Sequence, residues 1–238
     1  MCIAIYKPKG KEISKDTLKT CHEANPDGGG FMFNHENTLH VQKGFMRFND
    51  FWASYNKINS VKYDMLIHFR IKTHGAISKA NCHPFLVSED IGFIHNGIIN
   101  IKTKGTESDT MAFNERILKN IDDLRTVIKS KGIQDLIADY IGSSKLVFLD
   151  NRNDFTIINE DLGTWNKGSW FSNDSFNSCA YDTFAFNKDY QYEINQNFAL
   201  CYNCDSELIT DFEIDNEICS DCIRTDSYYN KWYKERRY

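Results

Sequence analysis

Residues 65–75 read Met-Leu-Ile-His-Phe-Arg-Ile-Lys-Thr-His-Gly, a short apolar run followed by polar and basic residues. The run Met65–Arg70 is typical of a buried strand, and the residues after it predict a loop. Histidine, arginine and threonine side chains therefore come where a strand ends, and functional sites are often found on such loops. This stretch predicts a polar site at one end of a β-sheet.

Three further segments repeat this arrangement. Asn81-Cys82-His83-Pro84 follows the first loop, and Gly92–Asn100 reads Gly-Phe-Ile-His-Asn-Gly-Ile-Ile-Asn, again with polar residues after an apolar run. Glu107-Ser108-Asp109-Thr110 stands at the start of a predicted helix. We expect the loops that hold these segments to lie near one another.

The residue types in these segments suit an amino-acid substrate. Arg70 can bind a carboxylate through two parallel hydrogen bonds. Asn96 and Gly97 can offer a side-chain amide and a backbone N–H to an oxyanion. Asp109 can pair with an ammonium group. The alternatives are a surface ion pair for Arg70 and a favourable first-turn position on the helix dipole for Asp109.

Cys2 directly follows the initiator Met1. A small side chain at position two favours removal of Met1, which would leave Cys2 with a free α-amino group. Because an α-amine has a pKa of about 7.7–8.0, close to that of a free thiol, one residue would then supply both a nucleophile and its general base. The alternative is a small residue buried in a first strand.

Apolar spacing predicts strands and helices along residues 1–190. The polar stretch Asn187–Asn197 is the best linker candidate. The predicted strands are Cys2–Tyr6, Gly30–Asn34, Leu39–Gly44, Met65–Arg70, Ile91–His95, Lys145–Asp150 and Phe155–Asn159. The predicted helices are Ser14–Ala24, Asp50–Ile58, Asp109–Asn120 and Gln134–Ile141, with Ser14 and Ser108 as N-caps and Gly142 as the last C-cap.

Composition and charge exclude several classes of protein. The chain has 238 residues, 41% of them hydrophobic and 14% aromatic, enough for a substantial core. Its net charge of −5 disfavours binding of a strongly anionic partner by bulk electrostatics. No apolar run approaches the roughly 18 residues of a membrane span, and residues 1–11 lack the order of a secretory signal. We expect a cytosolic protein.

Four of the eight cysteines form a C-x2-C-x14-C-x2-C pattern near the C-terminus. All seven histidines lie at or before His95, so this group is an all-thiolate site. Its spacing predicts a tetrahedral Zn²⁺ site, structural because four thiolates leave no open position for chemistry. The zinc would supply folding free energy to a segment of about 40 residues. The predicted ligands are Cys201, Cys204, Cys219 and Cys222.

The charge of this zinc ribbon favours a protein partner over nucleic acid. From Cys201 to Ser227, eight acidic residues stand against Arg224 alone, which disfavours phosphate binding. The tail Tyr228–Tyr238 carries four basic residues, one acidic residue and interleaved aromatics. Such a tail could stack on single-stranded bases, but a short amphipathic helix folded onto the ribbon is the preferred interpretation.

The motifs taken in order resemble the glutaminase domain of class II glutamine amidotransferases, which are N-terminal nucleophile hydrolases. The resemblance covers roughly residues 2–180. Each motif alone is a weak signal, and their order and spacing together make a strong one. The motifs are Cys2, His-Phe-Arg-x-x-Thr-His-Gly from His68, Asn-x-His-Pro from Asn81, His-Asn-Gly-Ile-Ile from His95 and Ser-Asp-Thr from Ser108.

This resemblance implies an α+β fold, a four-layer αββα sandwich, with the zinc ribbon as a second domain. It implies hydrolysis of glutamine to glutamate and ammonia through a thioester on Cys2, with Asn96 and Gly97 as the oxyanion hole. Arg70 would bind the α-carboxylate and Asp109 the α-ammonium, and no cofactor would take part in catalysis. Thr73 and His74 would shape the Arg70 loop, whereas no histidine is assigned as a base or metal ligand.

Several positions depart from the family pattern. Ile3 follows the nucleophile where the family usually has glycine, and Ile71 replaces the aromatic residue that often follows the motif arginine. The usual Arg-Gly-x-Asp-Ser-x-Gly segment is represented by Asn25–Gly30, which lacks the arginine. We place the hydrolase domain at residues 2–188, a linker at 189–198, and the ribbon with its tail at 199–238.

Since 40 residues of ribbon cannot hold an acceptor site, the resemblance implies a separate synthase that receives the ammonia, docked with help from the ribbon. Two other functions stay open. One is an N-terminal-cysteine amidase acting on a different γ-glutamyl or acyl amide. The other is an inactive hydrolase fold that presents the ribbon to a protein or nucleic acid, favoured by Ile3 and by the missing arginine near Asp27.

Overall fold

The computed structural model describes residues 2–58, 60–72 and 75–177. The chain divides into two units, Met1–Asp182 and Thr183–Tyr238, and the described residues all belong to the first. The predicted zinc ligands, the linker, Thr73 and His74 lie outside the described residues. The domain boundaries at 188 and 199 therefore stay a prediction.

Six strands form one antiparallel sheet in the order β3-β2-β4-β1-β10-β9. Strand β1 lies in its interior, with Ile3 opposite Phe69 and Lys7 opposite Met65 of β4. The strands are β1 (Ile3–Lys7), β2 (Gly29–His35), β3 (Thr38–Phe45), β4 (Met65–Phe69), β9 (Thr164–Asn166) and β10 (Ser169–Phe171).

A second antiparallel sheet has four strands in the order β5-β6-β7-β8. Its strands are β5 (Phe85–Leu86), β6 (Ile91–Asn96), β7 (Lys145–Asp150) and β8 (Phe155–Ile158). The helices are α1 (Lys15–Ala24), α2 (Phe48–Tyr55), α3 (Asp109–Arg116), α4 (Leu124–Val127) and α5 (Lys131–Ile141). Short 3₁₀ turns cover Ser60–Lys62, Leu118–Asn120 and Glu160–Leu162.

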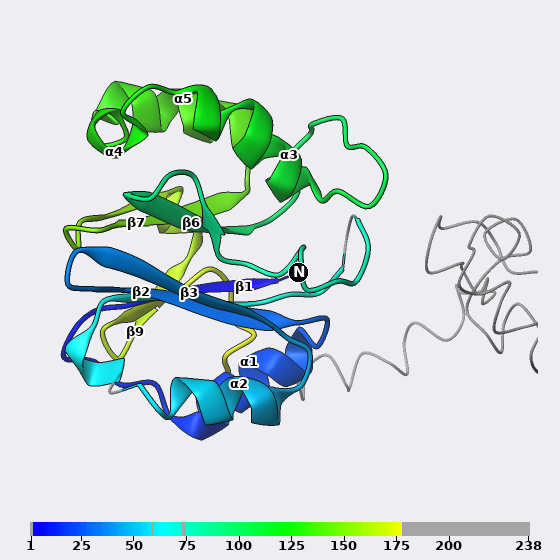
Figure 1. The fold of residues 1–238 in the computed structure, drawn as a ribbon, viewed down its shortest axis with the longest axis vertical. Coiled ribbons are helices and arrows are strands. Elements are labelled where there is room, and N and C mark those ends of the chain that lie inside the picture. The colour runs from blue at the N-terminus through cyan, green and yellow to red at the C-terminus, as the bar shows by residue number, and fades with distance from the viewer. Residues whose placement is uncertain (1, 59, 73–74, 178–238) are drawn as a thin grey trace, which may run out of the picture. The chain divides into compact units, whose positions relative to one another are not determined.

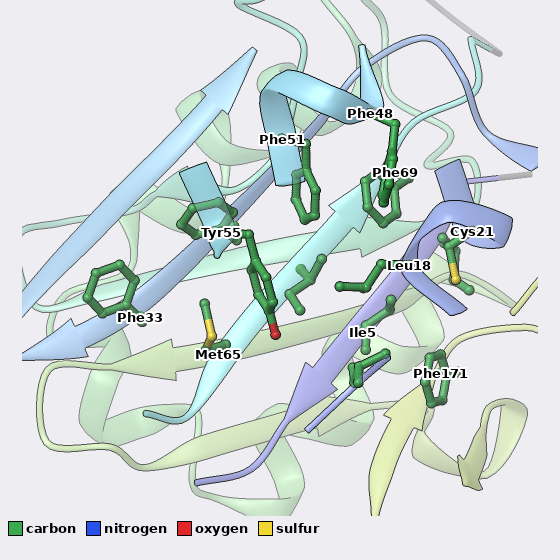
Figure 2. Close-up of a cluster of buried hydrophobic side chains, with 14 residues drawn as sticks. Ile5, Leu18, Cys21, Phe33, Phe48, Phe51, Tyr55, Met65, Phe69 and Phe171 are labelled. Carbon is green, nitrogen blue, oxygen red and sulfur yellow. The ribbon is translucent and has the colours of Figure 1, made fainter. Parts of the chain in front are cut away.

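Three buried apolar clusters arrange these elements in four layers, helices, sheet, sheet and helices (Figure 1). The first lies between α1, α2 and the six-stranded sheet, where Leu18 and Phe51 pack toward Ile5 and Phe69 (Figure 2). The second lies between the four-stranded sheet and α3–α5, and the third joins the inner faces of the sheets. Antiparallel sheets with separate helices confirm the predicted α+β class.

Side-chain alternation explains this layering. Ile3 and Ile5 of β1 face the helices, whereas Ala4 and Tyr6 face the second sheet, so both faces of the strand are buried. The N-caps predicted at Ser14 and Ser108 are confirmed, since each hydroxyl accepts a backbone N–H three residues on. Gly142 is the C-cap of α5, with φ of +58°.

Three predicted helices have bounds that differ from those observed, and one of them, α5, begins at Lys131 instead of Gln134. The helix predicted to run to Asn120 ends at Arg116, because the Asn120 side chain donates to the carbonyl of Glu115 (3.0 Å), which competes with the next helical turn. Helix α2 covers Phe48–Tyr55 instead of Asp50–Ile58. Within the described ranges, no helix combines the length and apolar character that a membrane span requires.

Candidate active site

Cys2 immediately precedes β1, next to the end of the neighbouring strand β4. Its Sγ contacts the backbone of Ile71, 3.3 Å from the carbonyl oxygen and 3.4 Å from the amide nitrogen that donates to it. The carbonyl of Cys2 accepts hydrogen bonds from the side-chain amides of Asn96 and Asn173, the latter at 2.7 Å. The residue is therefore fixed through both its side chain and its main chain.

The alternation of β1 and β4 directs this end of the chain toward the second sheet. Ala4 of β1 and Leu66 of β4 lie in the apolar cluster between the sheets. Because side chains alternate along a strand, Cys2 lies on the same side of the sheet as Ala4, and Arg70 lies on the same side as Leu66. Asn96, at the end of β6, faces back toward Cys2 from the second sheet. The site thus lies where the central strands of the two sheets end.

A loop after β6 connects Asn96 to the helix that carries Asp109. Gly97 has φ of +137°, a backbone conformation that favours glycine. The carboxylate of Asp109 accepts the N–H of Ile99 (2.8 Å) and that of Thr110 (2.9 Å). Asp109 is 6% exposed. It therefore holds the loop after Gly97, and the same residue lines a small cavity.

The glycine-rich segment before β2 packs against Arg70. The backbone N–H of Arg70 donates to Gly28 (2.7 Å), and its carbonyl accepts from Asp27 (2.8 Å). The Asp27 carboxylate accepts the N–H of Lys72 (2.6 Å). Any side chain at position 30 would meet the His83 carbonyl at 2.2 Å. Asp27–Gly30 therefore supports the Arg70 loop even without the arginine of the family pattern.

Three buried histidines lie behind the site. His68 and His83 stack at 3.9 Å between ring centroids, His68 Nε2 lies 2.9 Å from the carbonyl of His95, and the N–H of His95 donates to His83. Burial lowers the pKa of His68 to about 3 and that of His95 to about 4. Burial also lowers the pKa of His83 well below its usual value. These rings are neutral at pH 7.

One cavity brings the predicted residues together. Cys2, Arg70, Gly97 and Asp109, which come from separate segments of the chain, line a space of about 20 Å³. Asn96 joins them through its hydrogen bond to Cys2. Such a volume holds about one water molecule, so a larger ligand requires neighbouring side chains to move. The remaining lining residues are Ile71, His83, His95, Ser108 and Thr110.

Sequence reasoning did not assign roles to Asn173, Ser144 or Thr110. Asn173 binds the Cys2 carbonyl, Ser144 packs against Gly97, and Thr110 Oγ1 lies 2.8 Å from Nδ1 of His95. Thr110 belongs to the motif Ser108-Asp109-Thr110, so the sequence did indicate that it lies near the site. Asn173 closes the segment Trp170–Asn173, whose sequence indicated a strand but no role for Asn173, and Ser144 stands in no motif. The pairing of strands places both residues here.

Among the described residues, no group of three or more histidine, cysteine, aspartate or glutamate side chains is placed to hold a metal ion. The zinc prediction concerns other residues, Cys201, Cys204, Cys219 and Cys222, and is not tested by this finding.

No family model matches the chain, and no curated protein matches it. Among solved structures, it is similar to the glutamine phosphoribosylpyrophosphate (PRPP) amidotransferase from B. subtilis complexed with ADP and GMP, with 12% identity and a TM-score of 0.49. The match covers 78% of this chain and 44% of that one, so this chain spans less than half of its length.

Proposed function

We propose that this protein hydrolyses glutamine to glutamate and ammonia, with Cys2 as the nucleophile after removal of Met1. The observation that carries the proposal is the single cavity lined by Cys2, Arg70, Gly97 and Asp109. It supports the proposal because the residues around one small space include a cysteine, an arginine, a glycine and an aspartate. These types can supply a nucleophile, a cation for a carboxylate, a backbone N–H for an oxyanion and an anion for an ammonium group. These are the groups that an enzyme acting on a free amino acid amide needs.

The environment of Cys2 calls for a nearby base. Burial raises the pKa of the thiol, while the hydrogen bond from Ile71, the Arg70 charge and the N-terminal charge oppose this shift. The thiol of the chain that carries Met1 is therefore protonated at neutral pH. The α-amine exposed by loss of Met1 would have a pKa of about 7.7–8.0 and can accept that proton. His95, with a pKa of about 4, is a much weaker base.

The remaining residues divide into substrate binding and charge stabilisation. Arg70 would bind the α-carboxylate of glutamine, and Asp109 would bind the α-ammonium. Thr73 and His74 would complete the Arg70 loop. The Asn96 side-chain amide and the Gly97 N–H would donate to the oxygen of the tetrahedral intermediate. To do so, the Asn96 amide must give up its present hydrogen bond to the Cys2 carbonyl. Asn173 also donates to that carbonyl and can keep the nucleophile in place.

The reaction would then proceed in two steps, formation of the thioester and its hydrolysis. The thiolate forms a bond to the side-chain carbonyl carbon, the C–N bond breaks, and ammonia leaves with the proton carried by the α-amine. Water then attacks the thioester, the amine takes up one of its protons, and glutamate leaves as the thiol is restored. This is the fold type and chemistry of an N-terminal nucleophile hydrolase, to which we assign the four-layer domain.

We propose from its spacing that the distal cysteine quartet, Cys201, Cys204, Cys219 and Cys222, binds a structural Zn²⁺. The acidic ribbon around it would help dock a separate synthase that consumes the ammonia. Copurification experiments that repeatedly find no ribbon-dependent partner would count against this docking role.

The direct test is release of ammonia and glutamate from glutamine by the full-length protein. We expect Cys2→Ala to lower the rate by at least about 10³-fold without loss of folded protein. Cys21→Ala is the matched control, because Cys21 is a thiol on the buried face of α1 and its loss should leave the rate unchanged. Equal rates for wild type and Cys2→Ala would reject the proposal.

The two charged residues Arg70 and Asp109 distinguish a glutaminase from an amidase that acts on another amide, because a site for a free amino acid needs both. N-acetylglutamine lacks the α-ammonium group that Asp109 would bind, so it should be a far poorer substrate than glutamine. Comparable kcat/KM values for the two compounds would favour the amidase interpretation.

A further inference from the structure

Gly97 is packed directly against Ser144, the last residue before β7. A Cβ at position 97 would lie 2.2 Å from Ser144 Oγ and 2.7 Å from its Cα, distances that real side chains do not reach. The φ of +137° at Gly97 likewise favours glycine. The backbone that carries the proposed oxyanion donor therefore rests on Ser144.

Two hydrogen bonds hold the peptide group between Ile98 and Ile99. Ser144 Oγ donates to its carbonyl oxygen at 3.0 Å, and Asp109 accepts its N–H at 2.8 Å. The Ile98 side chain is 52% exposed, whereas Ile99 is buried in the cluster between the four-stranded sheet and α3–α5. The loop after Gly97 is thus held by the burial of Ile99 together with polar contacts from Ser144 and Asp109.

Ser144 is itself fixed in place. It is 1% exposed, and the side-chain amide of Asn159 donates both to its carbonyl (2.8 Å) and to that of Gly142 (2.7 Å). Asn159 follows β8 and has φ of +60°, a conformation that asparagine tolerates. The connection from α5 to β7 is therefore a rigid support behind the loop.

We propose that Ser144 is a positioning residue for the reaction, holding the Gly97 N–H where the oxyanion of the tetrahedral intermediate forms. The inference rests on the proposed function. Ser144 touches neither Cys2 nor the substrate-binding pair in any contact described above, so its effect should fall on the transition state and not on ground-state binding.

The test compares Ser144→Ala with wild type in full-length protein. Loss of a whole oxyanion donor costs about 10²–10³ in rate, and a displaced donor should cost less, about tenfold in kcat with KM changed less than about twofold. Asn159→Gly, which keeps the φ but removes the amide, should show the same pattern more weakly. Ser169→Ala is the matched control, since Ser169 is equally buried and its hydroxyl has no hydrogen-bond partner among the residues that the structure describes.

Binding of two glutamate analogues separates positioning from a general structural defect. L-Glutamate γ-semialdehyde would form a tetrahedral adduct with the Cys2 thiol, whereas L-glutamate would occupy the site without one. Ser144→Ala should weaken the aldehyde about tenfold and leave glutamate within about twofold. Equal weakening of both, or of neither, in active protein would overturn the inference alone. Wild-type protein that releases no ammonia from glutamine would overturn the proposed function, and the inference with it.

Discussion

The two ends of strand β1 hold buried polar groups in different ways. At one end, Lys7 is fully buried, and its Nζ donates to the carbonyls of Pro8 (3.0 Å), Lys11 (3.1 Å) and Tyr63 (2.8 Å). An ammonium group has three donors, so every one is used. Burial lowers the pKa of Lys7 to about 8. This end is a completed structural cluster.

At the other end, near Cys2, several buried polar atoms have no hydrogen-bond partner among the described residues. They are Asn96 Oδ1, His95 Nε2 and His68 Nδ1. Each such atom costs about 1–3 kcal/mol when it is shut away from water. Some proteins carry that cost at functional sites. The Lys7 ammonium is thus fully paired, whereas the polar atoms near Cys2 keep hydrogen-bonding capacity that a ligand of the proposed site would use.

Lys7→Met tests the structural end and should have the largest effect. It leaves three buried carbonyls without their donor, which we expect to lower the free energy of unfolding by about 3 kcal/mol. Urea titration measures the loss, with the exposed Lys131→Met as control. The activity of the protein that remains folded should not change. A Lys7→Met protein that keeps its stability but loses its activity would contradict the structural role given to Lys7.

Asp109→Asn tests the other end. Loss of the carboxylate charge should lower kcat/KM for glutamine about 100-fold, because an ammonium group loses a charge-assisted partner. Asp150→Asn is a close control, since Asp150 is also buried and its carboxylate also accepts two backbone N–H groups, those of Arg152 and Asp154. If both variants lost the same activity, the charge of Asp109 would have no special role.

The buried histidines predict a smaller, pH-dependent effect. The pKa values of His68 and His95 in the folded chain lie below the unfolded value of about 6.5. As the pH falls below neutral, these histidines therefore bind protons in the unfolded chain before they do so in the folded chain. The stability from these groups is complete only at about pH 8 and falls as pH drops through about 6.5 toward 4, with a loss of about 0.8 kcal/mol for each such histidine at about pH 6. Urea titrations at about pH 8 and about pH 6 measure this difference. His95→Asn should reduce the dependence, whereas His40→Gln, at an exposed position, should not.

Local sequence pattern was sufficient for the strands that carry the site. Lys145–Asp150 was predicted with its observed bounds, and the strand that ends at Asn96 was predicted one residue short. The short strands β5 and β9 were not predicted, because two or three residues give too little periodicity to detect. Helix α5 begins three residues before its predicted start, since Gly132 weakens the helical signal there.

The site itself was predictable only where a motif existed. Cys2, Arg70, Gly97 and Asp109 stand in short motifs, and the structure brings them to one cavity. The small size of that cavity was not predictable, because it depends on how Ile71 and the buried histidines pack. Asn173 and Ser144 reach the site through strand pairing across long sequence separations, which local patterns do not encode.

The most direct test of the account is the intact mass of the full-length protein before and after exposure to a diazoketone analogue of glutamine. We predict a chain that lacks Met1 and gains one adduct, which peptide mapping places on Cys2. Such an adduct requires a processed, reactive thiol in a site that binds glutamine. Folded protein from its native host that retains Met1 and gains no adduct on Cys2 would contradict the account.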